Sequence, residues 1–388
     1  MKSILFVSAM EYEGERWGRT FPLAKAFSAN GFKVTLLVSK KIGLRFFKKE
    51  YHDNVTIICA NSLSPLLRRL PLIGIFTISF ILRLVHVLFT KYDYVYSDCG
   101  EIPCCGIPCR ISQLIHKSIY LSEYGDLLGR TGYYDKKPLY FKIFLGWYFL
   151  WSIKYFREKA DYVIVLSTEM QKYVNSEMKI KSNNIILLPG GSSPELIKYT
   201  EPKNISKPVK LGYIGIGNYE IEGIIPLLNT IKYFEPNSFK VLLFGKKIHP
   251  STIEKYSISN IIKEFGWIDV IKGQNIINDV DIFILMRKDM LISSMGWPNK
   301  LGDYMSYGRP ILIEPYGDLI PFVKQHSNGF IVVNKNDNNK LKEILNNIIN
   351  GKYNLIKMGE YNRHIAETEL TWNARVEKII NLIVKNES

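Results

Sequence analysis

The sequence has few of the features that mark several classes of protein. It contains only five cysteines, an odd number of which four are clustered, so no disulfide framework is expected. The cysteines form no Cys-x-x-Cys pair and the six histidines are scattered, so no metal site is predicted. Free cysteines indicate a reducing, cytoplasmic compartment. The cysteines are Cys59, Cys99, Cys104, Cys105 and Cys109.

The chain contains fewer acidic than basic residues. The chain has 51 Lys and Arg against 36 Asp and Glu, a net charge of +15. Residues 1–190 hold 26 basic and 15 acidic residues, a net charge of +11, and residues 191–388 account for the remaining +4. This excess of positive charge predicts an anionic partner, which we expect residues 1–190 to contact. Because no nucleic-acid-binding motif is present, we do not expect that partner to be nucleic acid.

Long apolar runs are also few. The run Ile4–Val7 is too short for a signal peptide. Pro71–Phe89 is long enough to span a bilayer, but Arg83 would lie at mid-span, at a cost of about 2.5–3.5 kcal/mol. We expect a crossover helix packed on a sheet; the alternatives are a helix whose outer face rests in a membrane interface, and a span. One polar stripe runs along this helix, formed by Ser79, Arg83, His86 and Thr90.

The chain alternates short apolar runs with helical stretches, and it does so in two series. Nearly continuous apolar runs are typical of strands covered on both faces, which predicts parallel sheets with helical crossovers. The first series of expected strands is Ser3–Val7, Lys33–Val38, Val55–Cys59, Tyr94–Ser97, Ile119–Leu121, Tyr162–Leu166 and Ile185–Leu188. The second is Val209–Ile214, Lys240–Phe244, Ile261–Phe265, Asp281–Met286, Pro310–Ile313 and Phe330–Val333.

Two α/β, doubly wound domains of the Rossmann type are therefore predicted. The segments Pro189–Pro194 and Glu201–Pro208 are rich in Pro, Gly and Ser, which mark a linker. We place the first domain at residues 1–190 and the second at residues 191–370. The last segment, residues 371–388, is expected to be a helix that packs back on the first domain.

An aromatic segment lies at Tyr140–Phe156, where nine of 17 residues are aromatic and lysines are interspersed. Aromatic rings beside Lys and Arg suit the headgroup region of a bilayer. The alternative is a core helix of the first domain. On the membrane interpretation, the residues that meet the membrane or an acceptor are Trp147, Trp151, Lys154 and Arg157.

The most informative stretch is Gly296–Ile313. It predicts a loop, a helix that begins near Pro298, the tripeptide Gly-Arg-Pro and then a buried strand. Lys300 at the helix start suits an anion, and Asp303 suits a pair of ribose hydroxyls. Alone, each residue is equally typical of a solvated lysine or a first-turn carboxylate.

This stretch resembles the donor-site motif of nucleotide-sugar glycosyltransferases of the GT-B fold, most like the retaining family four (group 1 type). Five further segments resemble the same family in the same order: Trp17–Val38, Ala160–Ser167, Ile186–Ser192, Leu243–Gly245 and Leu370–Trp372. The resemblance implies two Rossmann-like domains that face each other across a cleft. It also implies transfer of a hexose from a nucleotide diphosphate sugar to a hydroxyl with retention of configuration, generally without a metal or other cofactor.

The resemblance also implies roles for individual residues. Lys300 matches the lysine that contacts the donor diphosphate, and Asp303 takes the place of a glutamate that binds ribose. In the family, the strand that matches Tyr120–Tyr124 is often followed by His-Asp, and Asp126 matches the aspartate. Asp126 would orient or deprotonate the acceptor hydroxyl; alternatively it caps a loop. The other expected donor-site residues are Gly14, Arg16, Gly18, Gly215, Ser294, Gly296, Trp297, Pro298 and Asn299, and Arg19 offers further charge.

Two departures from the family pattern leave alternatives open. Met295 stands where the family has its first glutamate, and Gly215–Glu220 lacks the family's basic pair. We expect a transferase of polysaccharide biosynthesis, peripheral at the inner face of the cell membrane, with a lipid-linked or cell-surface glycan acceptor. The alternatives are a nucleotide-sugar epimerase on the same fold and a catalytically inactive GT-B-like protein at a membrane surface.

Overall fold

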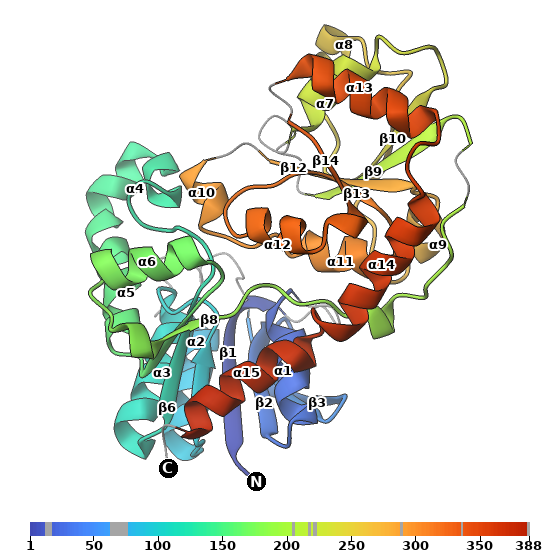
Figure 1. Ribbon diagram of the computed structural model, residues 1–388. Helices are drawn as coiled ribbons and strands as arrows, with labels where there is room; N and C mark the ends of the chain where they lie inside the picture. The colour runs from blue at the N-terminus through green and yellow to red at the C-terminus, as the bar shows by residue number, and fades with distance from the viewer. Residues whose placement is uncertain are drawn as a thin grey trace. The chain divides into compact units, whose positions relative to one another are not determined.

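The computed structural model describes residues 1–11, 18–62, 77–203, 206–215, 219, 223–287, 290–334 and 337–385. The chain divides into two units (Figure 1). The first contains Met1–Pro189, Ser294–Trp297 and the segment from Trp372 onward. The second contains Gly190–Ser293 and Pro298–Thr371. The change from one unit to the other after Pro189 lies at the start of the Pro-, Gly- and Ser-rich linker.

The first unit is built on an eight-stranded sheet with the order β3-β4-β2-β1-β5-β6-β7-β8. Its strands are β1 (Ser3–Glu11), β2 (Lys33–Lys40), β3 (Phe47–His52), β4 (Val55–Asn61), β5 (Tyr94–Ser97), β6 (Ile119–Tyr124), β7 (Tyr162–Val165) and β8 (Ile185–Leu187). Strand β3 pairs antiparallel with β4, whereas the other described pairs are parallel. The α/β doubly wound class predicted from the sequence is confirmed for this unit.

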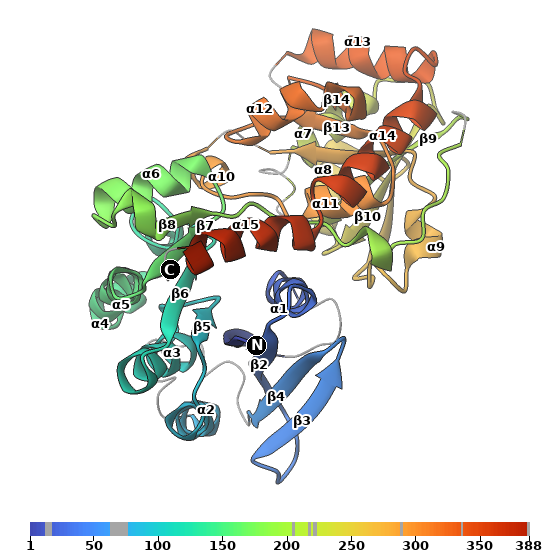
Figure 2. The same ribbon diagram turned by 60° about the horizontal axis from the view of Figure 1, so that its bottom comes forward.

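Helices cover both faces of this sheet. They are α1 (Thr20–Ala29), α2 (Ile78–Phe89), α3 (Pro103–His116), α4 (Leu139–Phe144), α5 (Gly146–Glu158), α6 (Thr168–Glu177) and α15 (Trp372–Lys385). Figure 2 shows α1 and α15 on one side of the sheet and α2, α3 and α5 on the other. Alternate residues of β1 explain this arrangement, because Phe6 belongs to the core under α1 and α15 whereas Val7 belongs to the core under α2 and α3.

The C-terminal helix α15 completes the core of the first unit. Val376, Ile379 and Ile383 are fully buried in the same cluster as residues of α1 and β1. The last helix of the chain therefore covers the sheet with which the chain begins.

The second unit is built on a six-stranded, parallel sheet with the order β11-β10-β9-β12-β13-β14. Its strands are β9 (Val209–Gly215), β10 (Phe239–Gly245), β11 (Ile262–Gly266), β12 (Ile282–Met286), β13 (Ile311–Glu314) and β14 (Phe330–Val332). The α-helices described between Val209 and Thr371 are α7 (Ile224–Ile231), α8 (Pro250–Tyr256), α9 (Gln274–Ile277), α10 (Leu291–Ser294), α11 (Lys300–Ser306), α12 (Leu319–Gln325), α13 (Asn338–Ile349) and α14 (Leu355–Thr368). This unit also has the predicted doubly wound architecture.

Helix α11 lies against the backbone at the start of the second unit. A Cβ atom added at Gly302 would overlap the carbonyl oxygen of Gly191. The neighbouring Ser192 is fixed from the other side, because its amide donates to the carbonyl of Leu370 at 2.7 Å and its hydroxyl donates to that of Ala366, also at 2.7 Å. The position of α11 therefore depends on a residue without a side chain at position 302.

We predict that Gly302→Ala destabilises the protein by about 1–3 kcal/mol, because the backbone overlap outweighs the better helix propensity of alanine. Gly296→Ala is the matched control, since a Cβ atom there meets nothing within 4 Å. Urea unfolding of both variants, followed by tryptophan fluorescence, measures the difference. Equal stability of the two variants would contradict the close packing of α11.

Candidate functional site

The second sheet has its topological switch point at β9, which pairs with β10 on one side and β12 on the other. In open parallel sheets, ligands bind outside the carboxyl ends of the strands at this point. Gly215 ends β9 and Met286 ends β12. Gly223, with φ of +70°, precedes α7 and lies so near Met286 that an added Cβ would be 2.9 Å from the Met286 Cβ. The backbone is thus closely packed around this point.

Lys300 places a positive charge at the switch point. It is the first residue of α11, and its Nζ lies over the ring of Tyr213, 4.4 Å from the ring centroid. Tyr213 belongs to β9 and is buried. The half-buried lysine from the predicted motif therefore lies beside the last residues of β9, near Gly215.

Tyr304 holds α11 to the sheet. Its hydroxyl oxygen accepts a hydrogen bond from the amide of Ile214 at 2.9 Å, and its ring stacks on Phe283 of β12 with centroids 4.1 Å apart. Asp303, the neighbouring residue, is half-buried on the same helix as Lys300. Fixing Tyr304 therefore also fixes the helix that carries Lys300 and Asp303.

The arginine of the Gly-Arg-Pro tripeptide has a structural role. Arg309 is buried, and its guanidinium donates to the carbonyls of Val280 at 2.8 Å, Thr200 at 2.7 Å and Asn278 at 3.1 Å. Burial lowers the pKa of this guanidinium from its ordinary value. The arginine thus joins the linker segment to the end of the sheet.

The predicted donor residues are divided between the two units. Pro298, Asn299, Lys300, Asp303 and Gly215 belong to the second unit. The short segment Ser294–Trp297, which contains Ser294, Gly296 and Trp297, groups with the first unit. Its Met295, at the position where the resembled family has a glutamate, is buried, as is Trp297.

The first unit contributes three of the expected donor residues, Gly14, Arg16 and Gly18. Gly14 and Arg16 lie outside the described residues. Gly18 is exposed and has φ of +53°, the left-handed conformation that favours glycine. Among the described residues of this loop, Gly18 alone remains a candidate, because the guanidinium of the next residue, Arg19, is hydrogen-bonded within the protein.

The structure corrects the expectation that Arg19 offers charge to a diphosphate. Arg19 is buried, and its Nε donates to Glu123 Oε2 at 3.0 Å. The two terminal nitrogens donate to the carbonyls of Pro189 at 3.1 Å and Leu188 at 2.7 Å. The guanidinium also lies over the ring of Trp372, 5.2 Å from its centroid. Its donors are engaged inside the first unit, so it supports the fold.

The structure also corrects the placement of Arg157 at a membrane surface. Arg157 is 1% exposed, donates to Glu101 Oε2 at 2.7 Å and stacks over Tyr124 at 4.1 Å from the ring centroid. Sequence reasoning missed this because Glu101 lies 56 positions away. By contrast, Trp147 and Trp151 are exposed, and so is Lys154.

Asp126 follows β6 at the carboxyl edge of the first sheet and is exposed. A second carboxylate at this edge, Asp98, was missed by sequence reasoning. It follows β5 beside β1, at the switch point of the first sheet. Asp98 accepts hydrogen bonds from the hydroxyl of Ser8, the amide of Ala9 at 3.1 Å and the hydroxyl of Thr20 at 3.3 Å. The signal was present in the sequence, because Asp98 directly follows an apolar strand.

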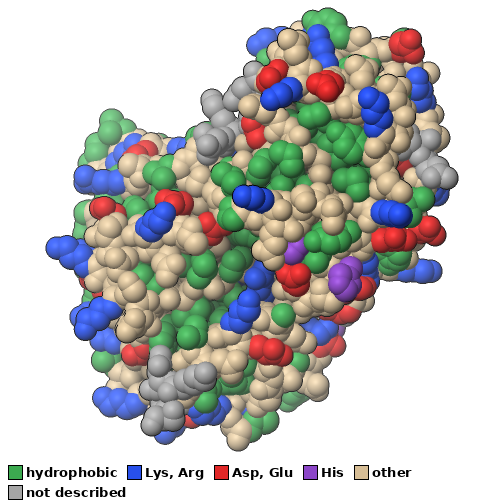
Figure 3. Space-filling model, in the orientation of Figure 1, with side chains coloured by type: hydrophobic (Ala, Val, Ile, Leu, Met, Phe, Trp, Pro, Cys, Tyr) green, Lys and Arg blue, Asp and Glu red, His purple; other side chains and the backbone are tan. Residues whose placement is uncertain are grey.

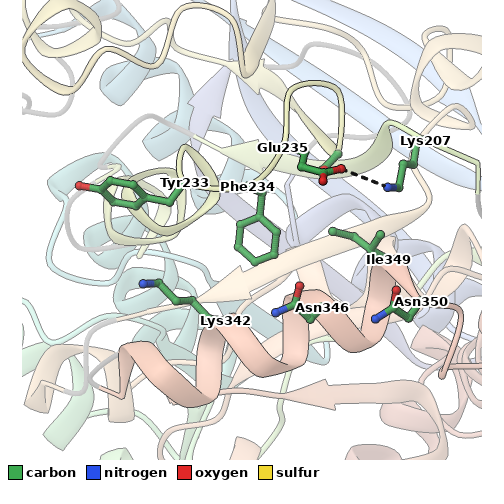
Figure 4. Close-up of a pocket in the computed structure, with 9 residues that line it drawn as sticks. Lys207, Tyr233, Phe234, Glu235, Lys342, Asn346, Ile349 and Asn350 are labelled. Carbon is green, nitrogen blue, oxygen red and sulfur yellow. Dashed lines mark ion pairs between the residues drawn. The ribbon is translucent and has the colours of Figure 1, made fainter.

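A pocket of about 500 Å³ lies elsewhere in the second unit (Figure 4). It is lined by Lys207, Tyr233, Phe234, Glu235, Ser238, Lys342, Asn346, Ile349 and Asn350. Lys207 and Ser238 shortly precede β9 and β10, so the pocket lies at the amino ends of these strands. Lys300 lies beside the opposite end of β9, and the pocket is therefore separate from the predicted donor residues.

In the described part of the chain, no cluster of His, Cys, Asp and Glu is arranged to hold a metal ion. None of the five cysteines, all of which lie in the described residues, forms a disulfide bond. None of the helices within the described residues has the length and apolar character needed to cross a membrane.

We predict a pH dependence of stability from Asp98. Burial raises its pKa from 3.8 to about 6, so the folded protein holds this proton more strongly than the unfolded chain. Asp98 therefore destabilises the fold progressively as pH rises through this interval, by roughly 1–3 kcal/mol. Asp98→Asn should remove this decline. Thermal unfolding of the wild type and of Asp98→Asn at several pH values in this interval measures the difference. If the melting temperatures of the two proteins changed with pH in parallel, Asp98 would have an ordinary pKa.

No protein-family model and no curated protein matches the chain. Solved structures do match. A sucrose-phosphate synthase from Thermosynechococcus elongatus has a TM-score of 0.72 at 16% identity, over 99% of each chain. Anabaena HepE in complex with UDP-glucose has a TM-score of 0.67 at 14% identity, over 99% of this chain and 100% of that one.

A third match is WaaG, described as a glycosyltransferase involved in lipopolysaccharide biosynthesis. Its TM-score is 0.64 at 12% identity, over 98% of this chain and 99% of that one. The matches extend over both units in each case. Together with the two doubly wound sheets, they show that the chain has the GT-B fold of these proteins.

Proposed function

We propose that the protein is a glycosyltransferase that moves a hexose from a nucleotide diphosphate sugar to a hydroxyl, with retention of configuration. The observation that carries the proposal is the position of Lys300, which extends over Tyr213 at the switch point of the second sheet. The GT-B fold supports it. HepE, which shares that fold, was solved with UDP-glucose and with UDP.

The donor would be held mainly by the second unit. In this proposal Lys300 pairs with the diphosphate, Asp303 accepts hydrogen bonds from the ribose, and Gly215 lets the backbone approach the ligand. The hexose would meet Ser294, Gly296 and Trp297. Catalysis would be charge stabilisation of the leaving diphosphate by groups held in place before the reaction, without a required metal.

The acceptor would be met by the first unit. Asp126, exposed at the end of β6, is proposed to orient or deprotonate the acceptor hydroxyl. The exposed Trp147, Trp151 and Lys154 support a peripheral position at the inner face of the cell membrane. A lipid-linked or glycan acceptor fits that position.

A second candidate is a catalytically inactive protein that still binds a nucleotide sugar. The buried Met295 favours it, because an apolar side chain stands where the resembled family has a carboxylate beside the sugar. The two candidates differ in turnover: the transferase releases nucleoside diphosphate from its donor, whereas the inactive protein binds the donor and leaves it intact.

We predict that Lys300→Ala weakens binding of uridine diphosphate by about 1.5–3 kcal/mol, or roughly tenfold or more, because it removes a charged phosphate contact. Isothermal titration calorimetry measures the change. Lys324→Ala, which removes an exposed lysine of α12, is the control and should bind normally. Unchanged affinity in the Lys300 variant would remove this lysine from the site.

We predict that Asp126→Asn slows transfer by about 10²-fold and leaves donor affinity unchanged, because the carboxylate acts on the acceptor. Transfer of a radiolabelled sugar to a membrane lipid extract gives the rate, and calorimetry with the nucleotide gives the affinity. If affinity falls while the rate constant stays the same, Asp126 belongs to donor binding instead.

A further inference from the structure

Helix α2 has its polar side turned inward. Arg83 is fully buried, and its guanidinium donates to Ser39 Oγ at 2.8 Å and to the carbonyl of Cys104 at 3.0 Å. Ser79, one turn earlier, lies with its Oγ 2.7 Å from Ser39 Oγ. His86 bonds to the hydroxyl of Tyr92 at 2.9 Å. The polar stripe identified in the sequence therefore fixes α2 to β2 and α3.

The outer side of α2 is consequently apolar. Phe89 is 85% exposed, and its outward neighbours recur at helical spacing along the rest of the helix. The exposed apolar residues of α2 are Ile78, Ile81, Val85, Leu88 and Phe89. Such an apolar stripe facing outward is typical of a surface that is covered in the working protein.

The neighbouring helices extend this surface. Helix α2 packs beside α3, and α3 packs beside α5, where a Cβ at Gly106 would lie 2.9 Å from the ring of Phe156. These three helices lie on the side of the sheet opposite α1 and α15, and α4 packs on α5 (Figure 2). Their exposed apolar residues are Leu114, Ile115, Leu139, Tyr140, Ile143, Phe144, Trp147 and Trp151. We refer to the outer sides of α2, α3, α4 and α5 as the α2–α5 face.

The charges on the α2–α5 face have one dominant sign. Its four helices together contain a single carboxylate, Glu158. Basic residues also outnumber acidic ones among the exposed residues of the segments that adjoin the helices. The exposed lysines of α5 and of these segments are Lys91, Lys117, Lys136, Lys137, Lys154 and Lys159, whereas the exposed carboxylates of the same segments are Asp93 and Asp135. Figure 3 shows apolar and basic side chains beside one another along the margin that carries α4 and α5.

We propose that the α2–α5 face lies in the interface of a lipid bilayer that contains anionic headgroups, with α2 and α4 as its two apolar contacts. Aliphatic and aromatic side chains on the backs of helices, bordered by lysines, match an interface of acyl chains and phosphates. A second copy of the chain is disfavoured as the occupant, because pairing this face with itself would bring like charges together. This membrane contact deepens the proposed function. Only the link to a lipid-linked acceptor rests on the proposed transferase activity.

The test compares Ile81→Glu with Ile320→Glu in flotation with vesicles. The two residues are matched in exposure, 53% for Ile81 and 56% for Ile320, but Ile320 belongs to α12 of the second unit. The vesicles are phosphatidylcholine alone and phosphatidylcholine mixed with phosphatidylglycerol. Wild type and Ile320→Glu should float with the mixed vesicles. Ile81→Glu should bind them roughly tenfold more weakly, because a carboxylate would replace an apolar side chain that enters the bilayer interface.

A second variant, Trp147→Glu, changes an exposed residue at the start of α5, next to α4 in the sequence, and should weaken binding similarly. Calorimetry with uridine diphosphate runs in parallel, and its outcome is independent of the vesicles. Failure of wild type to bind the nucleotide would overturn the proposed function and leave the vesicle result standing. Full vesicle binding by both Glu variants would overturn the membrane inference. So would a wild-type dimer in light scattering that Ile81→Glu dissociates, because the face would then join two copies.

Discussion

The first unit depends on the buried ion pair between Arg19 and Glu123. This one guanidinium joins the start of α1, strand β6, the carbonyls of Leu188 and Pro189 at the end of the unit, and Trp372 of α15. Removing either partner would leave an unpaired buried charge, which typically costs about 3–5 kcal/mol. The pair thus fixes the carboxyl edge of the sheet, where Asp98 and Asp126 are found.

In the second unit, the packing of α11 against the sheet and against the backbone of Gly191 plays the same role. Gly302 lets the helix approach the backbone of Gly191, and Tyr304 bonds and stacks on β9 and β12. Neither residue needs to touch a ligand. Together they determine where Lys300 and Asp303 lie, so the proposed donor chemistry rests on packing that the helix makes through its other residues.

Continuous apolar runs predicted the buried strands well, whereas β3 was missed because it is a charged strand at the edge of the sheet. The helical period revealed the polar stripe of α2 but not its direction, since the partners of Arg83 lie in β2 and α3. For the same reason the sequence alone suggested that Arg19 faces a diphosphate and that Arg157 faces a membrane or an acceptor. Each arginine forms an ion pair with a carboxylate that is distant in the sequence. The spacing of residues along the chain cannot predict such a pair.

The central claim is that a nucleotide diphosphate sugar binds to the second unit. It is tested most directly by screening nucleoside diphosphates and their sugars for an increase in the melting temperature of the full chain. We expect a saturable increase with at least one nucleotide and its sugar, because a ligand that binds only the folded state stabilises it by mass action. No increase with any nucleotide, together with no heat of binding in calorimetry, would contradict this claim.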